Sequence, residues 1–222
     1  MSLAELQDLV GDMVRDDSGQ VTAEDTARAI AAATERYAAD RPRTAVEEVA
    51  TGGGGPWLDL PTGWEPDFST LISLEHPVGR VPPAHLRHWQ LYQAPDGTRI
   101  MLARRVPADD QVRVTYTARH AVDATRDTTP AGDREALASW AAALLLDQLA
   151  AWYAGGSDST IQADRVDHGS KSADFAARAR ALRKRYLDHL GIDRRRNAAA
   201  GAMVDFDIAS SLGQRPIVRR GR

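Results

Sequence analysis

Two of the six histidines, His85 and His88, stand three residues apart, a spacing that can place two metal ligands on one helical turn. However, Pro82 and Pro83 precede the pair, and no acidic residue at a matching spacing supplies a third ligand. Histidines on a surface or at the edge of a hairpin explain the pattern better. We therefore expect neither a metal site nor a cofactor.

Two adjacent carboxylate pairs are the other candidates for acid–base chemistry, Glu47 with Glu48 and Asp109 with Asp110. Neighbouring residues on a strand point to opposite faces, and neighbours in a turn are solvated, so neither pair predicts a general acid and base. No serine lies in a Gly-x-Ser-x-Gly nucleophile elbow. An enzyme would need a deep pocket with converging polar groups, which no motif predicts. We expect the protein not to be an enzyme.

Four consecutive glycines, residues 52–55, invite comparison with a phosphate-binding loop. Such a loop needs a following helix whose N-terminus faces the anion, and usually a lysine. The chain instead continues with Pro56, Trp57 and, shortly after, Pro61. We interpret the glycines as a flexible connection into a β element.

The composition excludes several classes of protein. The chain has no cysteine, which excludes a disulfide scaffold, cysteine-ligated metal centres and thiol catalysis. No apolar run reaches the roughly 18 residues of a membrane span, and the first residues lack the basic-then-apolar order of a signal peptide. We expect a soluble, intracellular protein that does not bind membranes.

The net charge of −3 is unevenly distributed along the chain. Residues 193–222 contain seven arginines and three aspartates, so this segment carries +4 and the preceding residues carry −7. It also has few large apolar side chains, which is typical of an appendage and not of a core. We call residues 193–222 the C-terminal tail and expect it to be extended.

Apolar residues at helical spacing predict two N-terminal helices in residues 1–42. The first covers residues 3–14. The second follows Thr22, which forms a capping box with Asp25, and ends before Pro42. We assign residues 1–42 to a helical bundle.

Helical spacing returns in residues 130–192, which we assign to the same bundle. Residues 136–154 are apolar around so much of their circumference that we expect them to form the central buried helix. A polar linker follows, and a last amphipathic helix is expected to begin at Ser170 or Ser172 and to stop at Gly191.

Short alternating runs replace helical spacing in residues 43–129, which we assign to an inserted antiparallel β element. Strands are expected over residues 44–50, 71–75, 89–92, 100–102 and 112–118. The Asp96-Gly97 pair is a strong signal for a hairpin between the third and fourth of these. The expected fold class is α+β: mainly a helical bundle, with the β element inserted and the C-terminal tail extended.

Six short stretches, read in chain order, carry a resemblance to a known family. They are Leu60-Pro61-x-Gly-Trp64, Ile72-Ser73-Leu74-Glu75-His76-Pro77, the Tyr92-x-x-x-Asp96-Gly97 hairpin, the strand from Val112 to His120, Ala150-x-Trp152-Tyr153-Ala154, and Arg185-Tyr186-x-x-x-Leu190-Gly191. Together they resemble the head–tail connector (adaptor) proteins of tailed bacteriophages and their prophage relatives, over residues 20–192. The β element is longer here than in the minimal, nearly all-helical members, which leaves its role open.

The resemblance implies a structural protein of the virion neck, assembled in the host cytoplasm. In that family, helical bundles form a ring of about twelve copies beneath the portal protein. The implied partners are further copies of the chain, the portal, and a downstream neck or tail-completion protein, while DNA passes through the channel without specific binding. The β element would lie on the periphery or at a tail-side contact.

The resemblance also implies roles for two sets of residues. The ring body would be packed by residues of the last two helices: Leu137, Trp140, Leu144, Trp152, Tyr153, Phe175, Leu182 and Tyr186. The C-terminal tail would dock on the portal through Met203, Val204, Phe206, Ile208, Leu212, Arg215, Ile217, Val218, Arg219 and Arg220.

A different interpretation is a small nucleic-acid-binding or regulatory protein that uses the basic last helix and the tail. No aromatic side chain is interleaved with the arginines for base stacking, and no DNA-binding motif surrounds them. A solvated helix face is the competing explanation of these cations, which are Arg178, Arg180, Arg183, Lys184 and Arg185.

Overall fold

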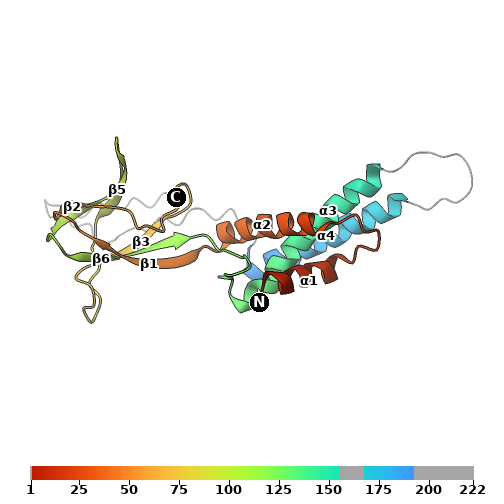
Figure 1. Cartoon of the computed structure of the whole chain (residues 1–222), viewed down its shortest axis with the longest axis horizontal. Coiled ribbons are helices and arrows are strands. Elements are labelled where there is room, and N and C mark those ends of the chain that lie inside the picture. The colour runs from red at the N-terminus through yellow and green to blue at the C-terminus, as the bar shows by residue number, and fades with distance from the viewer. Residues whose placement is uncertain (1, 156–167, 193–222) are drawn as a thin grey trace, which may run out of the picture.

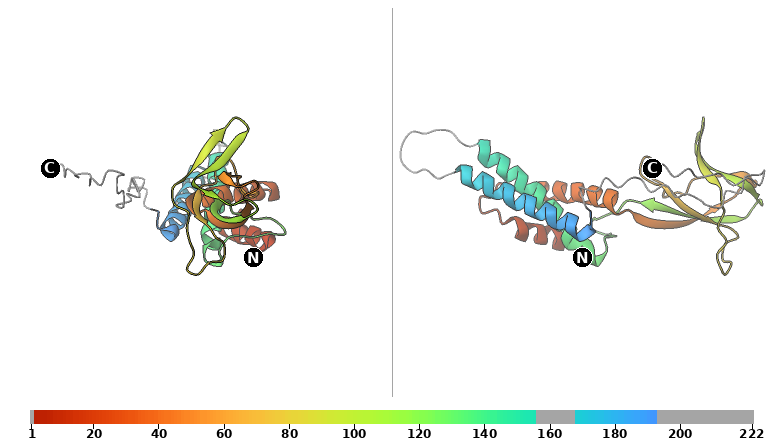
Figure 2. Two further views of the ribbon diagram at one scale, coloured as in Figure 1. Left: turned by 90° about the vertical axis from the view of Figure 1, so that its left-hand side faces the viewer. Right: turned by 180° about the vertical axis from the view of Figure 1, so that it is seen from behind.

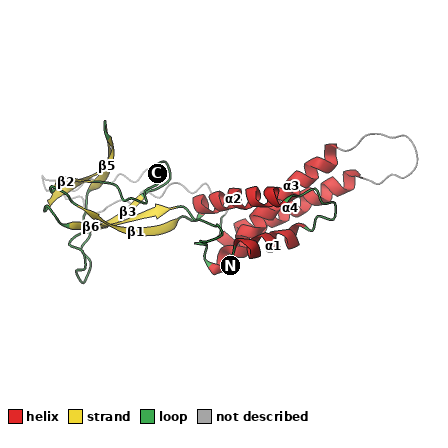
Figure 3. Cartoon of the chain, viewed as in Figure 1, coloured by secondary structure: helices red, strands yellow, loops and turns green. Residues whose placement is uncertain are grey.

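The computed structural model describes residues 2–155 and 168–192. In these residues, helices gather at one end of an elongated molecule and strands at the other (Figures 1 and 3). The helices are α1 (Leu3–Val14), α2 (Ala23–Asp40), the 3-10 helix η1 (Ala131–Asp133), α3 (Arg134–Gly155) and α4 (His168–Leu190). The strands are β1 (Arg43–Ala50), β2 (Gly55–Leu58), β3 (Leu71–Glu75), β4 (Trp89–Ala94), β5 (Gly97–Val106) and β6 (Gln111–Ala118). The α+β class is confirmed, whereas the predicted C-terminal tail lies outside the described residues.

Capping boxes begin both N-terminal helices. The Ser2 hydroxyl accepts a hydrogen bond from the Glu5 backbone N–H, and the Glu5 carboxylate accepts one from the Ser2 N–H. Thr22 and Asp25 form the same reciprocal pair at the start of α2, as predicted. Each cap satisfies backbone donors that the first helical turn leaves unpaired, which stabilises the helix by about 1 kcal/mol.

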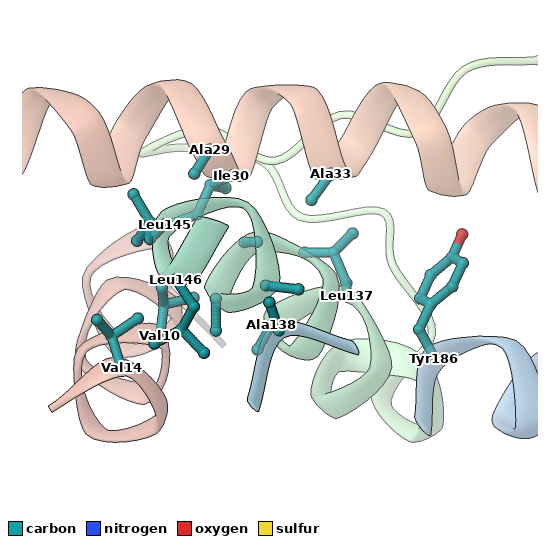
Figure 4. Close-up of a cluster of buried hydrophobic side chains, with 14 of the residues drawn as sticks. Val10, Val14, Ala29, Ile30, Ala33, Leu137, Ala138, Leu145, Leu146 and Tyr186 are labelled. Carbon is teal, nitrogen blue, oxygen red and sulfur yellow. The ribbon is translucent and has the colours of Figure 1, made fainter. Parts of the chain in front are cut away.

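Helix α3 is the centre of the bundle and packs against α1, α2 and α4. Most of its residues are buried whichever way they face, which confirms the prediction of a central buried helix. Many of them are alanines, and short side chains let the neighbouring helices approach closely. Figure 4 shows how α1 and α2 contribute to this core; its labelled members are Val10, Val14, Ala29, Ile30, Ala33, Leu137, Ala138, Leu145, Leu146 and Tyr186.

The start of α4 corrects the sequence prediction. The helix begins at His168, so neither Ser170 nor Ser172 is its N-cap. The Ser172 hydroxyl instead donates to the carbonyl oxygen of Ala150 in α3, 2.8 Å away. The hydroxyl therefore bonds to another helix and does not cap its own. A local sequence pattern cannot predict such a distant partner. The end of α4 is as predicted, because Gly191 adopts a left-handed φ of 68° and closes the last turn.

The strands form two three-stranded antiparallel sheets, in the orders β1-β6-β3 and β2-β5-β4. The predicted hairpin is confirmed, since Ala94 pairs with Gly97 at the β4–β5 turn. Strand β6 is central in its sheet, and its alternate residues Val112, Val114 and Tyr116 are buried, as the period-two pattern predicts. One hydrophobic cluster contains residues of both sheets and is separate from the helical core.

Strand β2 corrects the interpretation of the glycine-rich stretch as only a flexible connection. Gly55–Leu58 pairs with β5 at a sheet edge, and the register shifts between Gly55 and Trp57. Pro56 lies at this shift; a proline cannot donate to a ladder and is tolerated at edges and bulges. Gly54 has a φ of 72°, and a Cβ there would lie 2.7 Å from the backbone nitrogen of Ala108. The glycines therefore permit a close turn into a strand.

Candidate functional site

The adjacent carboxylates Glu47 and Glu48 have structural partners on opposite faces of β1. Glu47 accepts hydrogen bonds from the backbone N–H and hydroxyl of Thr62, at 2.7 and 2.8 Å. Glu48 pairs with Arg113 of β6 at 2.8 Å. Burial, the largest single influence, raises the pKa of Glu47, but the hydrogen bonds to its carboxylate outweigh burial and hold that pKa below its usual value. Both carboxylates therefore join β1 to neighbouring segments of the β element.

The other acid–base candidates also hold loops together. Asp110 lies 2.8 Å from His76 Nε2, and this hydrogen bond is the main cause of a lowered pKa of Asp110. His85 forms an isolated β-bridge with Glu75. Within residues 2–155 and 168–192, no group of three or more histidine and carboxylate side chains is arranged to hold a metal ion.

The Leu60-Pro61-x-Gly-Trp64 stretch, part of the family resemblance, packs against the central strand. Trp64 contacts the ring of Tyr116 with a centroid distance of 5.8 Å. A Cβ at Gly63 would collide with the Tyr116 hydroxyl, so glycine is required for this approach. The Tyr116 hydroxyl in turn donates to Glu47 at 3.2 Å. The motif therefore has a packing function in this structure.

A buried carboxylate, missed at the sequence level, joins three elements where the bundle meets the strands. Asp133 of η1 is 5% exposed. It accepts hydrogen bonds from the Tyr37 hydroxyl of α2, from Arg41 Nη1 at 2.9 Å and from His189 Nε2 of α4 at 2.9 Å. Burial most strongly raises the pKa of Asp133, but its hydrogen bonds and the Arg41 charge together hold that pKa below the usual value. The site is a structural anchor with a charged carboxylate at its centre.

His120 extends this junction toward the sheet. Its ring lies against that of Tyr37 with a centroid distance of 4.8 Å. Its Nε2 is 3.1 Å from the carbonyl oxygen of Arg41, and its Nδ1 is 3.0 Å from that of Thr128. The chain that leaves α2 and the chain that returns from β6 are thereby fastened to each other beside the bundle.

The basic residues of α4 are only partly a solvated face. Arg178 donates to the carbonyl oxygens of Met13 and Val14, at 3.0 and 2.8 Å, at the C-terminal end of α1. Such carbonyls lack helical partners, so a cation satisfies them and complements the helix dipole. Arg183 and Arg185 pair with carboxylates of α3. Three of the five cations therefore fasten the bundle, which argues against a nucleic-acid-binding face.

The eight residues predicted to pack the ring body all lie in α3 and α4: Leu137, Trp140, Leu144, Trp152, Tyr153, Phe175, Leu182 and Tyr186. Most contribute to the core of the single chain. Tyr186 is fully buried with Trp140 against it, at a centroid distance of 4.8 Å, and Tyr153 stacks on Phe175 at 5.4 Å. Trp152 differs, because it is 52% exposed and so presents a large apolar side chain at the surface.

The predicted docking tail lies outside the described residues. The same is true of its ten predicted contact residues: Met203, Val204, Phe206, Ile208, Leu212, Arg215, Ile217, Val218, Arg219 and Arg220. The last turns of the helix that precedes it lie beside the end of α2, since the Tyr186 hydroxyl donates to Asp40 at 2.8 Å. The chain therefore leaves α4 near the middle of the long axis, between the bundle and the sheets (Figure 1).

An exposed aromatic pair lies on the outer face of the β2-β5-β4 sheet. Trp57 and Tyr92 are 41% and 43% exposed, and their ring centroids are 5.2 Å apart. Trp57 is paired with Met101 of β5. A shallow cavity of about 270 Å³ next to them is lined by His88, Trp89, Gln90, Met101 and Ala103. Exposed aromatic residues of this kind are frequent at protein–protein contacts.

A groove of about 500 Å³ at the far end of the bundle is the candidate for a small-molecule site. Charges of both signs line it, including Arg15, Asp17, Lys171 and Asp174. Asp16 is occupied with its own loop, accepting from the Ser18 and Val21 N–H groups at 2.9 and 2.8 Å. The Ser18 hydroxyl also donates to the Asp16 carboxylate, so both side chains are used within this loop.

None of the helices described is long and apolar enough to cross a membrane. No family model and no curated protein matches the chain.

Among solved structures, the chain is similar to chains of gene transfer agent (GTA) particles. One is from the neck of an empty particle computed with C6 symmetry, with 17% identity, coverage of 76% of this chain and 87% of that chain, and a TM-score of 0.26. A second is from the neck of the native particle computed with C12 symmetry, with 17% identity, coverage of 79% and 92%, and a TM-score of 0.26. A third is from the virion of the native particle, with 17% identity, coverage of 79% and 88%, and a TM-score of 0.25.

Proposed function

We propose that this chain is a structural protein of the neck of a phage-like particle. Copies of it form a ring, of about twelve subunits as in the family it resembles, between the portal and the next neck or tail-completion protein. The helical bundle forms the ring body, the C-terminal tail docks on the portal, and DNA passes through the channel. Assembly in the host cytoplasm agrees with a chain that has no cysteine.

The observation that carries this proposal is the division of an elongated molecule into two parts with separate cores. The helical core and the core shared by the two sheets have no residue in common. The parts are joined at the Asp133 anchor and lie at opposite ends of the long axis (Figure 1). A linking protein needs two such ends, one for ring neighbours and one for the next component. The Trp57–Tyr92 pair gives the strand end an apolar contact surface.

The position and composition of the C-terminal tail support its role as a docking arm. It starts between the two parts, and thirty extended residues can reach on the order of 100 Å. Its charge of +4 differs in sign from the −7 of the other residues, which favours an extended partner-binding segment over a packed element. In a ring, the tails bind multivalently, so each contact can be weak.

The acidic body also suits a DNA channel. Non-specific DNA binding depends on cations that contact phosphates. A body that carries −7, with three cations of α4 paired with groups of the same chain, therefore lets DNA slide without sticking.

A truncation tests the proposal. We expect a chain ending at Ile192 to keep the far-UV circular dichroism of the folded body while losing binding to purified portal in a co-sedimentation assay. A full-length chain in which Arg87 and Arg104 of the β element are replaced by alanine is the control, and it should bind normally. Normal portal binding by the truncated chain would show that the docking assignment is wrong.

A further inference from the structure

We infer that neighbouring copies contact each other through the acidic outer face of α1 and the basic outer face of α4. This inference rests on the proposed ring, and it names the surfaces that build that ring. It concerns residues that the described body leaves exposed and that its own core does not use.

The outer face of α1 is uniformly acidic. Glu5, Asp8 and Asp12 are all exposed, and the helix contains no lysine or arginine. Their spacing of three and four residues places them along one side of the helix. Within the described part of the chain, neither Asp8 nor Asp12 has an ion-pair partner. The face is therefore open to an external cation.

The outer face of α4 has the opposite charge. Arg180 and Lys184 are exposed and four residues apart, so they lie on one side of the helix. Arg180 has no ion-pair partner among the residues described, and Lys184 pairs only with the exposed Asp188 of the next turn. Between Lys171 and Leu190 the helix carries six cations and two carboxylates, a net charge of +4.

The two faces lie at the same height along the bundle. Arg178 of α4 donates to the carbonyl oxygens of Met13 and Val14, which places it level with the end of α1. The two helices are antiparallel, and from that level α1 followed toward its N-terminus and α4 followed toward its C-terminus extend in the same direction along the bundle (Figure 1). Each covers roughly 18 Å there at 1.5 Å per residue. Arg180 and Lys184 are therefore level with the acidic row of α1.

The two faces also point to different sides of the molecule. Seen end-on, α4 lies on one side of α3, while α1 and α2 lie on the other (Figure 2, left). A contact between α1 of one copy and α4 of the next is head-to-tail, and such contacts close into rings when a rotation brings each copy onto its neighbour. For a rotation axis parallel to the bundle, level faces mean that each copy meets the next without displacement along that axis, which is the condition for a closed ring and not a helix.

Charge-reversal variants of the full-length chain test this inference. Variant A carries Asp8→Lys and Asp12→Lys, so both of its faces are basic. Variant B carries Arg180→Glu and Lys184→Glu, so both of its faces are acidic. The control carries Arg87→Glu and Arg104→Glu, which change the net charge as much as variant B does but lie at the strand end. Self-association is measured by sedimentation velocity at low and high salt, after circular dichroism has verified folding.

We expect wild type and control to associate alike, and more strongly at low than at high salt. Variants A and B alone should each associate at least about tenfold more weakly, because like charges then face each other. An equimolar mixture should regain association, since each basic face can meet an acidic face of the other variant.

Failure of the mixture to associate, or unchanged association of A and B alone, would overturn the inference. So would a wild type that does not associate at low salt. These outcomes are separate from the portal-binding test, which can succeed with a different subunit contact.

Discussion

Replacement of Asp133 by alanine tests the anchor between the bundle and the sheets. The substitution removes the acceptor of three donors, from Tyr37, Arg41 and His189. The Tyr37 side chain is fully buried, so its hydroxyl is left without a partner and without access to water. An orphaned buried donor costs about 1–3 kcal/mol.

The other two donors add less to the cost. Arg41 and His189 are both well exposed, and water replaces the lost contact, so each is worth about 0–1 kcal/mol. We therefore expect Asp133→Ala to lower the free energy of unfolding by about 1–5 kcal/mol. Tyr37→Phe removes one donor and leaves the carboxylate with two partners, so it should cost about 0.5–1.5 kcal/mol.

Urea denaturation followed by circular dichroism measures both variants and their combination. The double variant should cost less than the sum of the single variants, because no orphaned hydroxyl remains once Tyr37 is phenylalanine. A loss below about 0.5 kcal/mol for Asp133→Ala, or additive costs in the double variant, would refute the assignment of this carboxylate as the anchor.

Three further predictions address the body. The pKa of Asp133 is lowered in the folded state, so its contribution to the free energy of unfolding is present above the unfolded pKa and is lost as pH falls through the folded pKa. The difference in stability between wild type and Asp133→Ala, measured by urea denaturation, should therefore shrink in acid and not grow. Gly63→Ala should cost about 1–3 kcal/mol in the same assay, because the added Cβ displaces the Tyr116 ring. Gly53→Ala is the control and should be nearly neutral, since the space at its Cβ is open. Equal costs for the two variants would contradict the packing argument. Leu146 is fully buried, so Leu146→Ala should cost about 2–5 kcal/mol of stability in thermal melts. Trp152 is exposed, so Trp152→Ala should change the stability of the monomer by less than about 1 kcal/mol. It should instead weaken ring formation, which sedimentation measures.

Features that depend on neighbouring residues could be predicted from the sequence. The Thr22 cap, the Asp96-Gly97 hairpin and the Gly191 stop each need only a few consecutive residues, and all three occur where expected. The burial of α3 follows from its apolar residues on every side.

Features that depend on distant partners could not be predicted in this way. Ser172 lies inside α4 and its hydroxyl donates to Ala150 of another helix, and Gly55–Leu58 is a strand that pairs with the edge of β5. The hydrogen-bond donors to Asp133 are separated from it by more than fifty residues in sequence, so no local motif predicts this anchor. Its one signal is a carboxylate directly before an apolar helix.

The charged surfaces of α1 and α4 could also be predicted only in part from the sequence. The basic residues of α4 were visible in the sequence, but the engagement of Arg178 with the end of α1 follows only from how the helices pack. Likewise, the acidic row of α1 is a candidate partner of Arg180 in a neighbouring copy only because the structure places both at the same level along the bundle. Charge composition can therefore identify the candidates, and packing determines which remain available to a partner.

Electron microscopy of the purified full-length chain, alone and mixed with its portal, tests the central claim most directly. The account predicts closed rings with rotational symmetry, stacked on the portal and formed by the bundles side by side. Dispersed single copies in the presence of the portal, or open filaments in place of rings, would contradict it.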